Sequence, residues 1–432
     1  MTKTPFEHLQ TEAVAKERAF DEFVRRNFRW NFTFNLLYGL FGTTGWRLIM
    51  APTFVPTYIH QLGGSNFIVG LLFFFGGLTR FITPPVTASL VEHHVQLKKQ
   101  SILVGSLMRI QVLMMAVAGF FFSAHLNLIS FFIFFSLFNL FMGMQNVVYN
   151  TVMAKVIPVD RRGRFIGLRE FVGGVTAFLV ALVAGSLVER LTFPHGYAAT
   201  YFLAFLLTSA GLAFFAFSRE PATPAALDRK PPLERLRSLP TLMREDRNFA
   251  NYCLCRVVGS LALMSRPFFI LYVGKTISLS GTHLGWLTSF FLFSQTFINL
   301  FLGRVADQSG FRKVFMISVI LWTVGMAALV LLPISFGMAS VIFIALGAGM
   351  GGFMMSMQNM ALEFGSTADL PMRIGLANSI GQSSLALGPL LAGFLADNVS
   401  YESLFWISIA CTATALGIMY FSVSEPRNRN PA

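Results

Sequence analysis

The sequence predicts an all-α membrane protein with twelve transmembrane helices arranged as two pseudo-symmetric six-helix bundles. Three observations support this fold class: the composition, the length of the apolar runs, and a polar pattern that occurs twice. Of the 432 residues, 54% are hydrophobic, 12% are charged and 48 are Phe, and the mean hydropathy is +0.63. Soluble globular domains are far less apolar, so most of this chain is expected to lie in lipid.

The apolar runs have the length of membrane spans. A helix needs about 20 mostly apolar residues to cross a bilayer. The runs are continuous, which favours helices over the short alternating strands of a barrel. The twelve predicted spans cover residues 31–58, 66–88, 100–123, 126–152, 165–189, 197–218, 250–274, 283–302, 314–333, 337–363, 372–396 and 402–423.

A polar pattern, named here the cassette, occurs in both halves of the chain. Its order and nearly its spacing return after roughly 210 residues. Two membrane halves built on one plan are typical of solute carriers, in which the substrate binds between the repeats near the bilayer midplane. The first copy consists of Met144-Gln145-Asn146, Ile166-Gly167-Leu168, Ala184-Gly185-Ser186-Leu187 and Glu189. The second copy consists of Met357-Gln358-Asn359, Ile374-Gly375-Leu376, Ala392-Gly393-Phe394-Leu395 and Asp397.

The basic residues predict an orientation in the membrane and no nucleic-acid partner. The net charge is +13, with 33 Lys and Arg residues in the chain. Two of these, Arg190 and Lys275, fall on one side of the predicted membrane and six fall within spans, which leaves 25 on the other side. By the positive-inside rule, both termini are expected in the cytoplasm, with the protein in the plasma (inner) membrane.

A proline-rich, charged interruption separates the two predicted bundles. It contains Pro221, Pro224, Pro231, Pro232 and Pro240, and a segment of this composition does not cross a bilayer. The sequence therefore predicts five parts. They are a cytoplasmic tail at 1–30, a six-helix bundle at 31–218, a cytoplasmic linker at 219–249, a second six-helix bundle at 250–423 and a cytoplasmic tail at 424–432.

The loop between the eighth and ninth spans carries a recognisable motif. It reads Gly303-Arg304-Val305-Ala306-Asp307-Gln308-Ser309-Gly310-Phe311-Arg312-Lys313. This loop resembles the Gly-x-x-x-Asp-x-x-Gly-x-Arg-Lys loop of the major facilitator superfamily, which has twelve helices in two pseudo-symmetric halves. The counterpart loop of the first half is degraded, with Glu92 in place of the Asp.

The resemblance implies gating contacts between the halves on the cytoplasmic side. Asp307 is expected to reach the start of the fifth span near Arg164 and Arg169, and Glu92 to reach the start of the eleventh span near Arg373. A carboxylate beside a helix N-terminus gains about 0.3–1 kcal/mol from the helix dipole. The alternative is that these charges anchor the loops at the lipid headgroups. The motif residues assigned to gating are Gly303, Asp307, Arg312 and Lys313.

Arg47 and Arg266 are predicted near mid-depth on the first and seventh spans, which are equivalent in the repeat. There an Arg costs roughly 2.5–3.5 kcal/mol to insert, which implies a partner or a wet cavity. Two guanidiniums from opposite halves suit an anion. The pair resembles the organophosphate-phosphate antiporters of the superfamily, where one Arg from helix 1 and one from helix 7 hold the phosphate. The alternative is a structural role for one Arg. Pro52, Pro56 and Pro267 are expected to bend these spans.

Three further arginines within spans are expected to have structural roles. Arg80 and Arg256 lie within about two turns of the cytoplasmic surface, from which an Arg side chain reaches the interface. Arg109 is deeper, on the third span, and is expected to bind carbonyls of neighbouring helices.

Neutral polar residues of the fourth and tenth spans are the remaining candidates for the substrate site. Their side chains are expected to contact the substrate, and the alternative is that they form hydrogen bonds between helices, which average under roughly 1 kcal/mol. These candidates are Gln145, Asn146 and Tyr149 on the fourth span and Gln358 and Asn359 on the tenth.

The sequence therefore predicts an alternating-access secondary transporter, and not an enzyme, for a small anionic solute. The alternatives are an antiporter that exports amphipathic drugs and a non-transporting membrane sensor of the same fold. The fifth span lacks the Gly-Pro pair of the drug-antiporter branch of the superfamily. No cofactor or metal is expected. The protein is expected to be a monomer in the lipid bilayer, with a small-molecule substrate and no nucleic-acid partner. Because no Asp or Glu lies near mid-depth, the coupling mode stays open between anion exchange, facilitated diffusion and a proton carried by Glu170.

Overall fold

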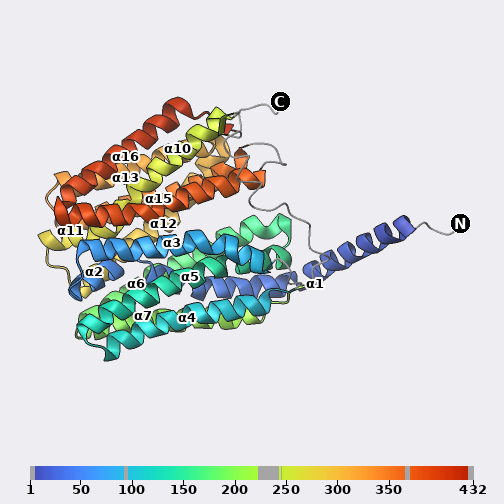
Figure 1. Cartoon of the computed structure of the whole chain (residues 1–432), viewed down its shortest axis with the longest axis horizontal. Coiled ribbons are helices and arrows are strands. Elements are labelled where there is room, and N and C mark those ends of the chain that lie inside the picture. The colour runs from blue at the N-terminus through green and yellow to red at the C-terminus, as the bar shows by residue number, and fades with distance from the viewer. Residues whose placement is uncertain (1–4, 92–95, 222–242, 245, 365–369, 427–432) are drawn as a thin grey trace.

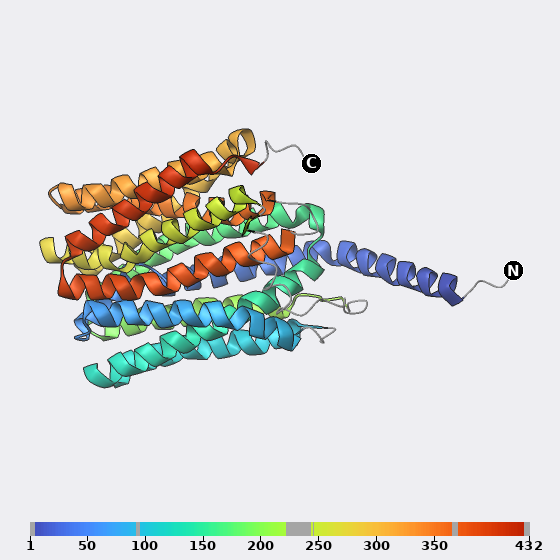
Figure 2. The same cartoon turned by 45° about the horizontal axis from the view of Figure 1, so that its top comes forward.

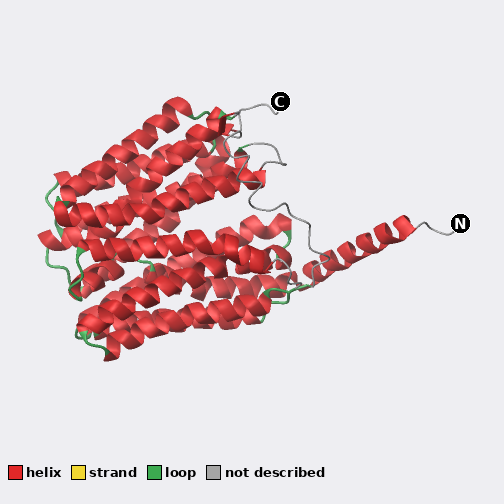
Figure 3. Cartoon of the chain, in the orientation of Figure 1, coloured by secondary structure: helices red, strands yellow, loops and turns green. Residues whose placement is uncertain are grey.

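The computed structural model describes residues 5–91, 96–221, 243–244, 246–364 and 370–426, and long helices run side by side through it (Figure 1). Within the described residues the regular structure is helical throughout, and Figure 3 shows no strand among them. The helices are α1 Pro5–Ile49, α2 Phe54–Gln61, α3 Asn66–Val91, α4 Lys98–Phe121, α5 Ala124–Val156, α6 Val159–Arg190, α7 His195–Ala216, α10 Arg247–Ala262, η1 Leu263–Phe268, α11 Phe269–Thr276, α12 Gly281–Ser309, α13 Phe311–Leu331, α14 Phe336–Met360, η2 Ala361–Glu363, α15 Leu370–Asn398 and α16 Tyr401–Ser422.

The predicted all-α membrane fold is confirmed. In the described part of the chain, 11 helical segments are long and apolar enough to cross a membrane, and they coincide with the second to twelfth predicted spans. The second, predicted at 66–88, is Asn66–Thr87 in the structure. The first predicted span, 31–58, consists of the later part of α1 and the short α2. It is less apolar than the others because Asn31, Asn35 and Thr44 lie within it.

The α-helix is interrupted in both the first and the seventh span, as the prolines predict: the first after Ile49, and the seventh by a 3-10 stretch within a helical segment that runs from Arg247 to Thr276. These two interruptions are called breaks here. Helix α1 stops at Ile49, and α2 starts at Phe54, just after Pro52. The seventh span consists of α10, the 3-10 helix η1, which contains Pro267, and α11. Proline has no N–H to donate, so each break leaves backbone carbonyls without their usual helical partner. Broken helices at corresponding positions of two repeats are the structural mark of a transporter's binding site.

Two helix pairs join the first part of the chain to the second. Helix α3 packs along α15, and α6 packs along α12. In Figures 1 and 2 the helices up to α7 and the helices from α10 onward form two groups that meet along these pairs. The predicted bundle boundaries remain a prediction, since most of the linker, 222–242 and 245, lies outside the described residues.

The helices have two ends that are named here by their connections. The far end holds the connections 62–65, 122–123, 191–194, 277–280, 332–335 and 399–400. The terminal end holds the start of α1 and the end of α16, which lie on the same side in Figure 1. Helix α1 continues from Pro5 into the first span without a break and extends beyond the other helices at the terminal end (Figure 2).

Candidate functional site

One arginine lies at the break of the first span, and another lies at the break of the seventh span. Arg47 lies in the last turn of α1, and Arg266 lies in the last turn of η1. Both side chains cross to the other half of the chain. Arg47 Nη1 donates to Thr296 Oγ1 on α12 at 2.7 Å, and Arg266 Nη2 donates to the Met50 carbonyl at 3.2 Å. Since α1 ends at Ile49, Arg266 binds a carbonyl that the break has released.

Arg47 has an acidic partner. Its Nη2 lies 3.1 Å from Glu170 Oε2 on α6, and Glu170 Oε1 accepts a hydrogen bond from Arg169 Nη2 at 3.0 Å. Arg169 Nη1 also donates to the Tyr149 hydroxyl at 2.9 Å. The Glu170 side chain is 44% exposed, whereas Arg47 is 11% exposed. Two guanidiniums therefore share one carboxylate, and this carboxylate can be reached by solvent.

Arg266 has no such partner. In the described part of the chain five ion pairs form, and none includes Arg266. Its guanidinium lies over the Phe291 ring of α12, 5.8 Å from the ring centre. Phe291 and Thr296 lie on the same helix, so the structure brings Arg47 and Arg266 to neighbouring parts of α12. Among the described residues, the positive charge of Arg266 is met by a carbonyl dipole and an aromatic face.

Two other arginines within spans are structural. Arg109 Nε donates at 2.6 Å to the Thr208 carbonyl of α7, a neighbouring helix as predicted, and its Nη1 donates at 2.6 Å to the Gly105 carbonyl of its own helix. The interpretation of Arg256 as reaching the interface is wrong, because its side chain is buried inside the second half. There its guanidinium donates to Tyr252 Oη at 3.1 Å and to the Met357 carbonyl at 2.7 Å. Polar groups of its own helix α10 and of α14 therefore satisfy this charge, which the position in the span did not reveal.

The neutral candidates fall into two groups. Gln145 is buried and donates to Ser101 Oγ on α4 at 3.0 Å. Tyr149 is also buried, and its hydroxyl accepts a hydrogen bond from Arg169 on α6. Both residues therefore form contacts between helices. Asn146 and Gln358 are exposed, and Asn359 is half-buried and donates to the Met355 carbonyl of its own helix at 2.8 Å. In the described part of the chain, no hydrogen bond joins any two of these five side chains. Their contact with a substrate remains a prediction.

The loop motif is fastened within its own half. Gly310 has φ +80°, a conformation that favours glycine, and a side chain there would meet the Glu425 carboxylate. Arg312 Nη2 donates to the Tyr420 carbonyl at 2.6 Å, and Lys313 Nζ donates to Ser309 Oγ at 3.1 Å. A Cβ atom placed on Gly303 would lie 3.9 Å from the Met355 methyl carbon, which is an ordinary contact.

The predicted gating contacts at the terminal end are not formed in this structure. Asp307 and Arg164 are exposed, and no hydrogen bond or ion pair of either is present among the described residues. Arg169 binds Tyr149 and Glu170 instead. Arg373 Nη1 pairs with Asp246 Oδ2 at 2.6 Å. Its predicted partner Glu92 lies outside the described residues, so these gating roles remain predictions.

At the far end, the last acid of each cassette caps a helix of the opposite half. Asp397 Oδ1 accepts hydrogen bonds from Asn66 N and Nδ2 at 3.2 and 2.8 Å, and its Oδ2 accepts from Phe67 N at 2.8 Å, at the start of α3. Glu189 Oε2 accepts from Thr282 N at 3.1 Å, at the start of α12. Helix N-termini attract carboxylates because their first N–H groups are unpaired. The cassette pointed to these acids, but nothing in the sequence identified their partners.

The cassette glycines at the far end lie directly against the opposite half. A side chain at Gly393 would come within 2.5 Å of the Asn66 carbonyl oxygen, and one at Gly185 within 2.6 Å of Gly285 Cα. Thr53 and Thr288, both buried, also share a hydrogen bond across the two halves. The opposite holds nearer the terminal end, where a side chain at Gly167 or Gly375 would meet nothing within 4 Å. The far end is therefore closed, and the same two helices are uncovered towards the terminal end.

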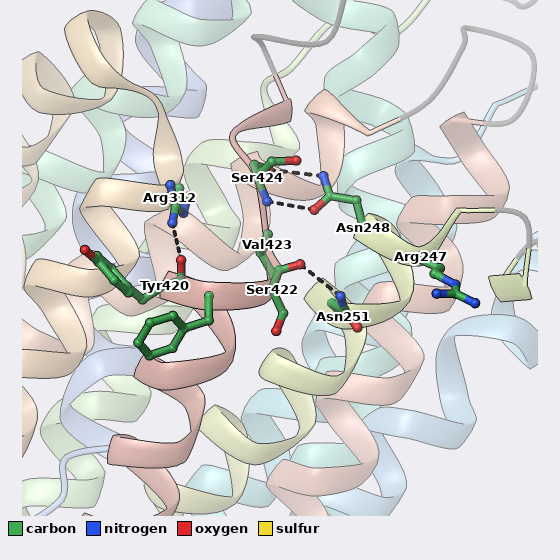
Figure 4. A pocket seen from close by; sticks show the side chains of 9 residues that line it. Arg247, Asn248, Asn251, Arg312, Tyr420, Ser422, Val423 and Ser424 are labelled. Atoms are coloured by element: carbon green, nitrogen blue, oxygen red, sulfur yellow. Dashed lines mark hydrogen bonds between the residues drawn. The ribbon is translucent and has the colours of Figure 1, made fainter.

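A pocket of about 380 Å³ lies away from these charges, at the terminal end of α10 and α16 (Figure 4). Several of its polar groups are already used. Asn248 Oδ1 accepts from Ser424 N at 2.8 Å, and Asn251 Nδ2 donates to the Ser422 carbonyl at 2.9 Å. These bonds fasten the end of α16 to α10. The pocket is thus a groove between fastened helix ends, and the charges at the span breaks remain the candidate site.

Comparison with known proteins agrees with this geometry. The family model described as Major Facilitator Superfamily matches residues 252–432. Multidrug resistance protein MdtG of Yersinia enterocolitica is 29% identical over 199 residues, which are 44% of this chain and 46% of that protein. The tetracenomycin C resistance and export protein of Streptomyces glaucescens is 26% identical over 133 residues, 30% of this chain and 24% of that protein. The chain thus spans less than half the length of these curated relatives.

Solved transporters share the fold over nearly the whole chain. The D-xylose-proton symporter has a TM-score of 0.71 at 13% identity and covers 93% of this chain and 99% of its own. The nucleoside transporter NupG has a TM-score of 0.68 at 12% identity and covers 92% of this chain and 99% of its own. At such identities the likeness concerns the fold alone.

Proposed function

The chain belongs to the major facilitator superfamily, and from this premise we propose that it is an alternating-access secondary transporter of a small anionic solute. A multi-pass membrane transporter of this fold moves small molecules between its two halves. The finer steps of the proposal are the charge of the solute, the residues that hold it and the direction in which the site faces.

The environment of Arg266 is the observation that supports a negative charge on the solute. Its guanidinium lies at the break of the seventh span, against the other half of the chain, and no carboxylate of the described residues neutralises it. An isolated positive charge inside a bilayer costs several kcal/mol, about 2.5–3.5 on insertion scales. A bound anion offsets this cost, and the planar donors of Arg suit a carboxylate or phosphate. Arg47 supports the same site but is already paired with Glu170.

The two ends support an alternating-access cycle. In this conformation the far end is closed by the caps of Glu189 and Asp397, and the terminal end is uncovered at Gly167 and Gly375. With the termini in the cytoplasm, as the charge distribution predicts, this is an inward-facing state. The contact of Asp307 with the start of α6 then belongs to the opposite state, in which the terminal end is closed.

A second candidate is export of amphipathic drugs. The names of the relatives favour it, since two of those compared are a multidrug resistance protein and an antibiotic export protein. Aromatic pairs that cross the two halves also fit an apolar compound. The rings of Phe171 and Phe297 lie 5.5 Å apart, and those of Phe178 and Phe293 lie 5.5 Å apart. A cationic drug is disfavoured by the unpaired charge of Arg266.

The charge class of a stabilising ligand separates the two candidates. Purified protein is heated with glycerol 3-phosphate, succinate, D-xylose or the cation tetraphenylphosphonium, because a ligand that binds the folded state raises its melting temperature. We expect stabilisation by an anion, and its loss in Arg266→Gln. Arg161→Gln is the matched control, since Arg161 is 55% exposed and pairs with Asp160 at the terminal end. Stabilisation by tetraphenylphosphonium alone would replace the anion proposal with drug export.

A further inference from the structure

Arg80 lies on α3, and its side chain turns away from the interface that sequence position suggested. Its Nε donates to the Gly76 carbonyl, one turn earlier, at 3.1 Å. Helix α3 runs from the far end at Asn66 to the terminal end at Val91, so this bond directs the guanidinium back towards the middle of the span. An arginine that reaches the membrane interface would extend the other way. The side chain is half-buried.

Helix α3 meets the second half of the chain at this level. Gly77, three residues before Arg80, is so close to α15 that a side chain there would lie 2.6 Å from Ala386 Cα. The same helix packs on η1, which carries Arg266. Arg80 and Arg266 thus lie on elements of opposite halves that pack on each other, so their like charges repel across this junction.

Neither of these two guanidiniums has an acidic partner among the described residues. Glu170, a described carboxylate between the halves, already pairs with Arg47 and Arg169. Arg80 binds only the Gly76 carbonyl, and Arg266 binds only the Met50 carbonyl and the Phe291 ring. Like charges repel more strongly in a medium of low dielectric constant than in water. A site with two positive charges and no carboxylate is complete only with an anion.

The N–H groups of Arg80 and Arg266 that make no hydrogen bond within the protein determine which kind of anion fits. Arg80 uses its Nε for Gly76, and Arg266 uses Nη2 for Met50, so each guanidinium keeps other N–H groups for a ligand. We infer that Arg80 and Arg266 together bind a doubly charged oxyanion between α3 and η1. Arg47 instead pairs with Glu170. The inference rests on the proposed transport of an anion and adds its charge and its second ligand residue.

The test compares small anions of different charge, of which succinate and butyrate share a four-carbon chain. The full chain is purified in detergent, and its dissociation constants for succinate, glycerol 3-phosphate and the monoanion butyrate are measured at pH 8. We expect at least one of the two dianions to bind more tightly than butyrate, and Arg80→Gln to weaken its binding by about 30-fold or more, since truncating one partner of a buried charged contact costs about 2 kcal/mol or more. Arg80→Lys keeps the charge but loses the planar donors, so we expect intermediate binding. Arg161→Gln should bind as the parent does.

The outcomes separate this inference from the proposed function. If Arg266→Gln loses dianion binding and Arg80→Gln retains it within about twofold, the anion transporter stands and the role of Arg80 is wrong. If the parent binds none of the three anions, both are wrong. If Arg80→Gln does not purify as a folded protein, Arg80→Lys decides, and unchanged dianion affinity in that variant contradicts the inference. The tighter of succinate and glycerol 3-phosphate shows whether the oxyanion is a carboxylate or a phosphate.

Discussion

The two ends of α6 and α15 differ in their contacts although each helix is continuous. At the far end Gly185 and Gly393 lie directly against the opposite half, and Glu189 and Asp397 cap its helices. Towards the terminal end, Gly167 and Gly375 of the same helices meet nothing within 4 Å. Both ends belong to the cassette, which therefore carries one closed contact and one open surface in each half. A rigid helix with one end fastened and one free is what a rocking transition between two states requires.

The largest effect is expected from a side chain placed in the closed contact. Gly393→Val puts a branched side chain against the Asn66 carbonyl and Phe67 Cα, at 2.5 and 3.0 Å from its first carbon, and backbone atoms there have little room to move. We expect the far end to open, with at least about a tenfold rise in its open population. Gly375→Val, on the same helix in open space, is the matched control.

The measurement is the labelling rate of a cysteine at Thr288, which is buried between the halves at the far end. The background lacks Cys253, Cys255 and Cys411. Faster labelling in Gly393→Val than in Gly375→Val is the expected result. Equal rates in the two valine variants would mean that the glycine contact does not hold the far end closed.

The next largest effect is expected from the acids that cap the helices. Asp397→Ala removes the acceptor of three hydrogen bonds at the start of α3, and a cap of this kind is worth on the order of 1 kcal/mol. We expect the labelling of Thr288→Cys to rise about fivefold. Glu189→Ala removes one bond to α12 and should give a smaller rise in the same direction. A larger effect of Glu189 than of Asp397 would contradict this order.

Asp307→Asn should act with the opposite sign and a smaller size. With the far end closed, Asp307 forms no hydrogen bond or ion pair with the described residues, so we expect the substitution to leave that state unchanged. If Asp307 stabilises the opposite state at the start of α6, its loss favours the closed far end, so labelling of Thr288→Cys falls and transport slows, each by less than about fivefold. Labelling and transport at the parental level would show that the loop is a membrane anchor.

A labelling pair with no expected effect on activity establishes which side each end faces. Ser123 is exposed at the far end and makes no capping bond, and Ser238 belongs to the predicted cytoplasmic linker, outside the described residues. In intact cells, an impermeant thiol reagent should label Ser123→Cys and leave Ser238→Cys unlabelled. The reverse pattern would invert the orientation and turn the inward-facing state into an outward-facing one.

The spans were predictable because hydropathy is a local property of the chain. The second span was predicted at 66–88 and is Asn66–Thr87 in the structure, and the breaks at Pro52 and Pro267 followed from proline chemistry. Pairings between distant residues were not predictable. Nothing in the sequence links Asp397 to Asn66, which lies 331 positions earlier, because only the packing of α15 on α3 brings them together.

The arginines show where depth in a span misleads. Arg256 was placed near the interface by position alone, yet Tyr252 and Met357 hold it inside the protein. Arg80 was placed there too, and its bond to Gly76 turns it towards the middle of the span. Side chains on helices point towards the helix N-terminus, and in α3 that direction leads away from the terminal end. To predict where an Arg side chain ends, the direction of its helix therefore has to be considered together with the depth of the residue in the span.

Because α1 is one continuous helix, the first span and the segment that extends beyond the other helices move together. From Pro5 to Ile49 the helix has 45 residues, which at 1.5 Å per residue is about 68 Å. Its inner end carries Arg47, at the site, and its outer end extends beyond the bundle. A rotation of the first half by about 10° therefore displaces the outer end by on the order of 10 Å, several times the displacement at the site. The protruding helix amplifies the transport cycle into a movement that a distance probe, or a partner that binds this helix, can detect or restrain.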